Sequence, residues 1–154
     1  APRANGAKFF SINNNGGYTM LTLIKKLKSE FDFIKDDIKE VRLNMIKETD
    51  FEVNDYRFIH SDRIDDILED ELESDEYILG CFNAWFIADI IDMDLEAVED
   101  LQKADKYEVL GKLMLPHIDK VAEQYVRYDG YGHHFAHYDG YEHEFDNWYI
   151  FRVN

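Results

Sequence analysis

The chain has 154 residues, of which 45% are apolar and 15% aromatic, and its formal net charge is −16. This composition excludes a largely disordered chain, and the length is that of one globular domain with a sizeable core. The charge argues against direct binding to nucleic acid or to anionic membranes, because phosphate neutralisation needs a basic surface, and it favours a basic partner.

The first part of the chain is predicted to be helical after a short leader. Residues 1–19 are rich in Gly and Asn and show no apolar period, so we expect a disordered or tag-like leader before a single globular domain over 20–154. Apolar residues at helical spacing then predict two amphipathic helices between Met20 and Met45.

The middle of the chain continues with a short extended segment and further helices. Residues 51–60 alternate imperfectly and indicate the extended segment. Ser61 and Asp62 are suited to capping an acidic helix that follows. Residues 75–91 are apolar nearly all round and predict a central buried helix. Later helices are expected over 95–103, capped by Asp94, over 105–114 and over 116–126.

Negative charge is concentrated in this middle part. Residues 48–109 hold 21 Asp and Glu against 4 Lys and Arg, whereas residues 1–47 hold 5 against 9 and residues 110–154 hold 7 against 4. Like charges repeat at three- and four-residue spacing along the first acidic helix, which costs a few tenths of a kcal/mol per pair. A solvated helix face explains that pattern, and so does selection for a negative surface. The candidate partner-binding residues are Asp62, Asp66, Glu69, Asp70, Glu73, Asp94, Glu96, Glu99 and Asp100.

Residues 84–103 have the spacing of a helix-turn-helix motif, with Asp92 in the turn. The second helix of such a motif would bring Glu96, Glu99 and Asp100 against the phosphates that flank every base edge. This charge pattern opposes DNA binding, so we interpret the segment as two packed helices.

The tail contains the tetrapeptide YDGY twice, and turn chemistry explains both copies. Gly130 can take the left-handed conformation that ends a helix, and Asp139-Gly140 is a two-residue hairpin signal. Asp146-Asn147 can form a second tight turn. We therefore predict an α+β fold: a mostly helical single domain, helical over 20–127, with a small three-stranded antiparallel β-meander over 131–154.

Four side chains of that meander are weak candidates for metal ligands: His133, His137, Glu142 and Glu144. The two histidines would lie roughly 13 Å apart along one strand, too far for a single tetrahedral ion. His137 with Glu142 is the best pair, and it lacks a third ligand. No nucleophile elbow, phosphate-binding loop or dinucleotide motif occurs in the chain. We therefore expect neither a cofactor nor an enzyme.

The cysteine content and the length of the apolar runs indicate the cellular compartment of the protein. The single cysteine, Cys81, excludes an internal disulfide, fits a reducing cytoplasm and is expected to be buried in its apolar surroundings. The longest apolar run, residues 77–91, is shorter than the roughly 20 residues that span a bilayer. No leader with a cleavage site is recognisable, so a cytoplasmic protein is expected.

Two stretches carry a resemblance to a known group: RFIHSDRIDDILEDELESDEYILGCFNAWFIADII and DGYGHHFAHYDGYEHEF. With the segment between them, they resemble small acidic proteins encoded by bacteriophages, which have a helical body and a DGYG…YDG tail. The resemblance covers about residues 56–154 and implies no catalytic residues. The group it resembles has no established activity. The resemblance implies a setting in an infected bacterial host, and small, acidic, non-enzymatic phage proteins in general often resemble antagonists of nucleic-acid machinery or defence systems.

The leading hypothesis is an acidic binding protein that inhibits a basic, nucleic-acid-binding host protein by presenting carboxylates in place of phosphates. A second hypothesis is a metal-dependent enzyme or metal-binding protein that uses the His- and Glu-rich tail. A third is a structural or regulatory protein that associates with itself through the aromatic residues of the tail.

Overall fold

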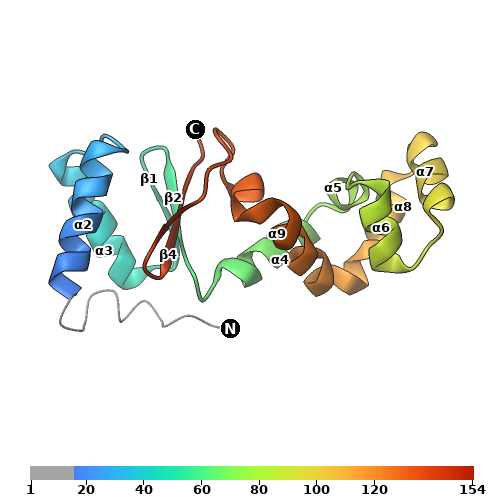
Figure 1. The fold of residues 1–154 in the computed structure, drawn as a ribbon, viewed down its shortest axis with the longest axis horizontal. Helices are drawn as coiled ribbons and strands as arrows, with labels where there is room; N and C mark the ends of the chain where they lie inside the picture. The colour runs from blue at the N-terminus through green and yellow to red at the C-terminus, as the bar shows by residue number, and fades with distance from the viewer. Residues whose placement is uncertain (1–15) are drawn as a thin grey trace. The chain divides into compact units, whose positions relative to one another are not determined.

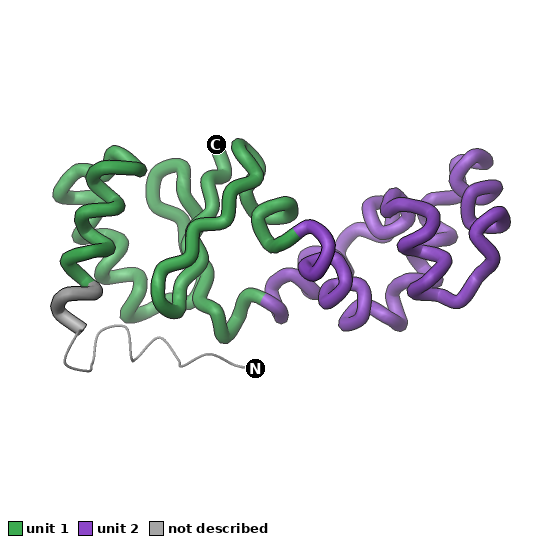
Figure 2. Tube along the Cα trace, in the orientation of Figure 1, with its two compact units in different colours: residues 1–64, 130–154 green, residues 65–129 purple. Residues whose placement is uncertain are grey.

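The computed structural model describes residues 16–154, with side chains from Met20 onward. The expected leader lies outside the described residues up to residue 15, and helix α2 (Gly16–Ser29) already includes its last four residues. The α+β class is confirmed, because most of the described chain is helical and its four short strands form one antiparallel sheet. The chain divides into two compact units: unit 1 is residues 1–64 with residues 130–154, and unit 2 is residues 65–129 (Figure 2).

Unit 1 packs helices α2 and α3 (Lys35–Lys47) against a sheet with the strand order β1-β2-β4-β3 (Figure 1). The strands are β1 (Asp50–Val53), β2 (Tyr56–His60), β3 (His143–Phe145) and β4 (Trp148–Arg152). Every neighbouring pair is antiparallel. The core between helices and sheet is built from buried side chains of both and of the α2–α3 linker: Leu23, Leu27, Phe33, Val41, Phe58, Trp148 and Ile150.

Both hairpins of this sheet turn on a residue with a positive φ. Asn54 has φ 54° between β1 and β2, and Asp146 has φ 51° between β3 and β4. Asn and Asp tolerate this left-handed conformation better than other residues with a side chain. The tight turn predicted at Asp146-Asn147 is therefore confirmed. The segment predicted over 51–60 is extended, but it forms a hairpin of two strands rather than a single one.

The three-stranded meander predicted over 131–154 is wrong. Helix α9 (Ile118–Phe135) is interrupted at Gly130, where φ is 77° and ψ is 168°, but it resumes and ends only at Phe135. Asp139-Gly140 lies in a loop, and β4 pairs on its other edge with β2 from the middle of the chain.

Burial explains why these tail residues are helical. The resumed turn of α9 places Phe135 wholly inside the core, with its ring 5.2 Å from that of Phe151. Gly132 lets the loop approach, since a Cβ there would lie 2.3 Å from the carbonyl oxygen of Gly140. A turn signal such as Asp139-Gly140 is local, whereas this packing depends on residues distant in sequence.

Unit 2 is entirely helical in the described structure. It contains α4 (Ile64–Glu73, of which Ile64 is assigned to unit 1), α5 (Glu76–Gly80), α6 (Ala84–Ile91), α7 (Leu95–Lys103), α8 (Tyr107–Met114), the short 3₁₀ helix η1 (Leu115–His117) and α9 as far as Asp129. Its core collects buried apolar side chains from most of these helices: Leu68, Leu72, Leu79, Ile87, Val98, Leu110, Met114 and Val121. Among residues 16–154, no helix has the length and apolarity needed to cross a membrane.

The single buried helix predicted over 75–91 is instead two helices, and Cys81 between them is exposed rather than buried. Gln102 of α7 stabilises the break, because its Nε2 donates to the carbonyl oxygens of Gly80 at 3.1 Å and Phe82 at 2.8 Å. These carbonyls leave the helical ladder but keep hydrogen-bond partners.

Helices α6 and α7 are packed together, as the sequence predicts. Asp92 ends α6 in the left-handed conformation, with φ 52° and ψ 51°, and the backbone N–H of Met93 donates to the carbonyl of Ala88 at 3.1 Å. Val98 of α7 is fully buried. The tight turn thus brings the acidic helix α7 against the apolar helix α6.

Two glycines allow α5 and α8 to touch through their backbones. A Cβ on Gly80 would lie 1.9 Å from the carbonyl oxygen of Tyr107, and a Cβ on Gly111 would lie 1.8 Å from that of Glu76. Only a hydrogen fits at such distances, so both positions require glycine.

The substitution Gly111→Ala should therefore destabilise the protein by about 1–3 kcal/mol, the usual cost of forcing an extra carbon into a packed interface. Urea unfolding followed by far-UV circular dichroism measures the loss. Lys112→Ala is the matched control, because Lys112 is the next residue of α8 and is exposed, so it should change stability by less than about 0.5 kcal/mol. Equal stability of the two variants would contradict the backbone contact.

His60 is a buried polar residue at the end of β2, with only 3% of its surface exposed. Its Nδ1 accepts a hydrogen bond from the backbone N–H of Asp62 at 3.1 Å, and its ring meets that of Trp148 edge-on at 5.0 Å. Its Nε2 is buried and has no hydrogen-bond partner among the described residues. Burial lowers the pKa of His60 below the ordinary 6.5, and the negative charges of Asp62 and Asp146 only partly oppose this.

Stability should consequently fall as the pH drops below about 6.5, because the unfolded chain then binds a proton that folded His60 resists. The slope from this one group is at most about 1.4 kcal/mol per pH unit. Unfolding free energies between pH 8 and pH 5 should decline less steeply in His60→Phe than in the wild type. The same comparison isolates His60 from His143, whose pKa burial also lowers. Parallel pH profiles would show that His60 is not the responsible group.

Candidate functional site

Nearly all of the net charge belongs to unit 2. Its residues 65–129 include 19 Asp and Glu against 5 Lys and Arg, a net charge of −14. The rest of the chain includes 14 acidic against 12 basic residues, a net charge of −2. The charge boundary therefore coincides with the structural boundary between the units.

Helix α4 displays four of the predicted carboxylates on one face. Asp66, Glu69, Asp70 and Glu73 follow one another at three- and four-residue spacing, which places them side by side along a helix. Glu69 is half-buried and the other three are exposed. The opposite face of α4 buries Ile64, Leu68 and Leu72, so the carboxylates are held on a helix fixed by its apolar side.

Glu69 is the most crowded of these groups. Partial burial raises its pKa first, and the negative charges of Asp66, Asp119 and Glu73 raise it further. Asp119 belongs to α9, so this helix adds an exposed carboxylate to the α4 face that sequence spacing did not indicate. Asp119 is 50 positions away in the chain, and only the helical packing of unit 2 brings it near Glu69.

Asp62, predicted as part of the same stripe, has a different setting. It precedes α4 and falls in unit 1, where its carboxylate lies 3.8 Å from Nδ1 of His60. About a third of its side-chain surface is exposed, 32%. We therefore separate it from the four carboxylates of the α4 face.

Helix α7 carries the second predicted group. Asp94 stands at its N-cap without a side-chain capping hydrogen bond, and Glu96 and Asp100 are exposed, while Glu99 is half-buried. Negative charges at the start of a helix are stabilised by the helix dipole, which offsets part of their repulsion. Helices α4 and α7 lie at opposite ends of unit 2 (Figure 1), so the predicted residues form two acidic faces rather than one stripe.

The candidate metal ligands do not share a strand face. His133 lies in the resumed part of α9, His137 in the loop that follows it, and Glu144 in β3. Glu142 accepts a hydrogen bond from the backbone N–H of Gly132 at 3.2 Å and so helps to fix the tail loop. Within residues 16–154, no group of three or more His, Cys, Asp or Glu is arranged to hold a metal ion.

The aromatic side chains of the tail are divided between core and surface. Trp148 and Phe151 are buried in the sheet, whereas Tyr138 and Tyr141 are exposed. The ring of Tyr138 is covered on one side by the guanidinium group of Arg152, at 3.8 Å from the ring centroid. Tyr138 and Tyr141 are therefore available for self-association through the tail, whereas Trp148 and Phe151 are not.

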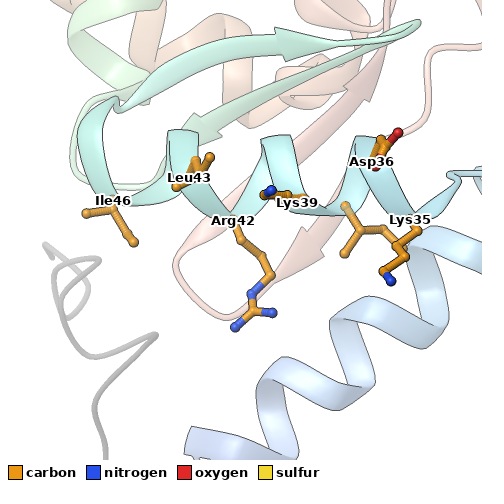
Figure 3. Close-up of a pocket in the computed structure, with 7 residues that line it drawn as sticks. Lys35, Asp36, Lys39, Arg42, Leu43 and Ile46 are labelled. Atoms are coloured by element: carbon orange, nitrogen blue, oxygen red, sulfur yellow. The ribbon is translucent and has the colours of Figure 1, made fainter.

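Unit 1 carries a hollow of the opposite charge, which sequence analysis did not single out. It has a volume of about 690 Å³ and is lined by residues of α3: Lys35, Asp36, Ile38, Lys39, Arg42, Leu43 and Ile46. Figure 3 shows Lys35, Arg42 and Ile46 projecting from the same side of that helix. Three cations against one carboxylate make this surface basic, in contrast with α4 and α7.

Comparisons of the chain with protein-family models, curated proteins and solved structures find no match.

Neutralising the most crowded carboxylate should stabilise the protein. Glu69→Gln should raise the unfolding free energy at pH 7 by up to about 0.5 kcal/mol, because each like-charge pair removed from a helix face is worth a few tenths. The gain should shrink at high salt, and also as the pH falls through the raised pKa of Glu69, since the wild type then protonates this group itself. Thermal unfolding at two salt concentrations measures it.

Glu30→Gln is the matched control for this experiment. Glu30 is an exposed helix-end carboxylate that lies 3.8 Å from Nζ of Lys26, so its neutralisation should bring no gain. Equal stabilisation of the two variants would mean that overall net charge, rather than crowding on α4, determines the effect.

Proposed function

We propose that this chain is a binding protein, not an enzyme, whose acidic unit docks on the basic surface of a nucleic-acid-binding protein and competes there with DNA or RNA. In keeping with the phage-like resemblance, the partner is a protein of a bacterial host, such as a component of a defence system, and the complex forms in the host cytoplasm. The contact residues include those of the α4 and α7 faces.

The observation that carries this proposal is the confinement of charge to unit 2. A net charge of −14 within 65 residues is maintained although neighbouring carboxylates on α4 repel one another and raise the pKa of Glu69. A solvated surface does not need such crowding, because solubility requires only a modest net charge with both signs interspersed. A surface that binds cations does need closely spaced carboxylates.

Carboxylates on rigid helices are suitable substitutes for phosphates. Arginine forms short, bidentate hydrogen bonds with both groups, so the same basic residues of a partner can bind either. The field of unit 2 also steers a basic partner toward it and repels nucleic acid from it. Inhibition then requires only that the acidic unit occupy the surface that nucleic acid would use.

The proposal predicts a salt-sensitive complex that depends on the α4 face. Immobilised protein should retain basic nucleic-acid-binding proteins from a bacterial lysate at low salt, and duplex DNA should displace them. For a purified retained partner, changing Asp66, Glu69, Asp70 and Glu73 to Asn or Gln should weaken binding by about tenfold or more, since each charge contact is worth about 0.2–1 kcal/mol. Calorimetry over a series of salt concentrations should also give a smaller salt dependence for the variant.

A control with the same change in net charge separates the site from the total charge. Asp36, Glu40, Glu48 and Glu52 are exposed carboxylates of unit 1, and neutralising these four should leave the affinity within about twofold. Retained proteins that DNA fails to displace, or equal losses in the two fourfold variants, would contradict the proposal.

A further inference from the structure

Unit 2 exposes two large aromatic side chains that touch each other. Trp85 of α6 is 49% exposed and Tyr128 of α9 is 59% exposed, although both are types that proteins normally bury in large part. Their rings meet edge-on, with centroids 5.3 Å apart and planes at 87°. The other tryptophan of the chain, Trp148, is 1% exposed in unit 1.

The pair is supported from below by further aromatic rings. Phe86 contacts both Trp85, at 6.0 Å between centroids, and Tyr128, at 6.4 Å. Phe82 stacks on Phe86 at 4.9 Å and meets Tyr125 edge-on at 5.0 Å. Phe86 and Tyr125 are buried, so the two exposed rings stand on a packed layer that limits their movement.

Two exposed carboxylates lie close to this pair in sequence. Asp89 is exposed one helical turn after Trp85 on α6, and Asp129 is exposed directly after Tyr128 on α9. Asp129 also adds to the effect of burial in raising the pKa of Tyr125 to about 12, which places its charge near the aromatic layer. The surface therefore combines exposed ring faces with negative charge.

We propose that Trp85 and Tyr128 form an arginine-binding anchor, in which a guanidinium group of the basic partner stacks on the rings while Asp89 and Asp129 neutralise its charge. This inference rests on the proposed function and names the residue type that unit 2 selects on its partner.

Physical chemistry favours arginine over the other possible occupants. A planar, weakly hydrated guanidinium stacks on an aromatic face and keeps its edge donors free for carboxylates, whereas a lysine ammonium is compact and strongly hydrated. A nucleic-acid base would bring phosphates against a unit with a charge of −14. Trp, Tyr and Arg are also the residues most enriched among those that dominate binding energy at protein interfaces.

The test compares an oligo-arginine with an oligo-lysine peptide of equal length, each titrated calorimetrically into the full chain. Carboxylates alone already favour arginine somewhat, so a preference for the oligo-arginine peptide is not sufficient evidence. The decisive quantity is the affinity for oligo-arginine divided by the affinity for oligo-lysine. This arginine-to-lysine ratio is compared between the wild type and a Trp85→Leu/Tyr128→Leu variant. A cation–π contact at an exposed site is worth about 0.5–1 kcal/mol, so this ratio should fall by about threefold or more in the variant. The oligo-lysine affinity should stay within about twofold.

Tyr77→Leu is the matched control, because Tyr77 is another half-exposed aromatic residue of unit 2, in edge contact with Tyr107. It should leave the ratio unchanged. Fluorescence gives a second readout: the arginine peptide should quench or shift the emission of Trp85, and Trp148 should be insensitive to it. Unchanged Trp148 emission and circular dichroism in the double variant show that it is folded.

The outcomes separate this inference from the function on which it rests. If the double variant keeps the wild-type ratio, the arginine anchor is refuted, while the proposed function stands provided that the fourfold α4 variant binds both peptides more weakly. If that α4 variant binds them as the wild type does, the proposed function fails, whatever the ratio.

Discussion

The backbone contact between α5 and α8 is the constraint on which the acidic unit depends. A body of 65 residues with a net charge of −14 is driven apart by its own field, and only apolar burial and close packing oppose this. Gly80 and Gly111 let two short helices approach until one backbone meets the other, which brings Leu79, Leu110 and Met114 into the core. Gln102 then satisfies the carbonyls at the break before α6. With the interior fixed in this way, nearly every charge can remain on the outside.

The sheet of unit 1 joins parts of the chain that lie before and after the acidic unit in sequence. Strands β2 and β4 are hydrogen-bonded neighbours, and His60 of β2 is paired with Trp148 of β4. All of unit 2 lies in sequence between these two strands, as an excursion from one antiparallel pair. The buried His60–Trp148 contact joins these two strands inside unit 1. Because a lowered pKa keeps His60 neutral, the sheet at this point does not have to accommodate a charge.

Local signals predicted the class of the fold and most of the helices, and they failed where long-range packing decides. The turn at Asp146 and the acidic face of α4 follow from residue types and spacing within a few positions. The prediction of a meander in the tail was wrong because Asp139-Gly140 is as good a hairpin signal as Asp146-Asn147. Only the burial of Phe135 and the pairing of β4 with β2 distinguish the two signals. The prediction of one helix over 75–91 missed the break at Cys81 for a similar reason, since an apolar run does not show that Gly80 will meet the backbone of Tyr107. For the site, spacing identified the carboxylates of α4 and α7 but not Asp119 or the exposed Trp85–Tyr128 pair, which are assembled from helices distant in sequence.

Charge and exposed aromatic rings have complementary roles in such a surface. Carboxylates act over about a Debye length, raise the rate of encounter and treat any cation alike, so they supply little discrimination and lose strength with salt. Ring faces act only in contact, distinguish a planar guanidinium from a round ammonium, and are far less sensitive to salt. A competitor of nucleic acid needs both properties, because many proteins are basic but few place an arginine where two fixed rings and two carboxylates can meet it. Trp85 and Tyr128 stand on a buried aromatic layer, so the geometry that discriminates is set before any partner arrives, and little conformational entropy is lost on binding.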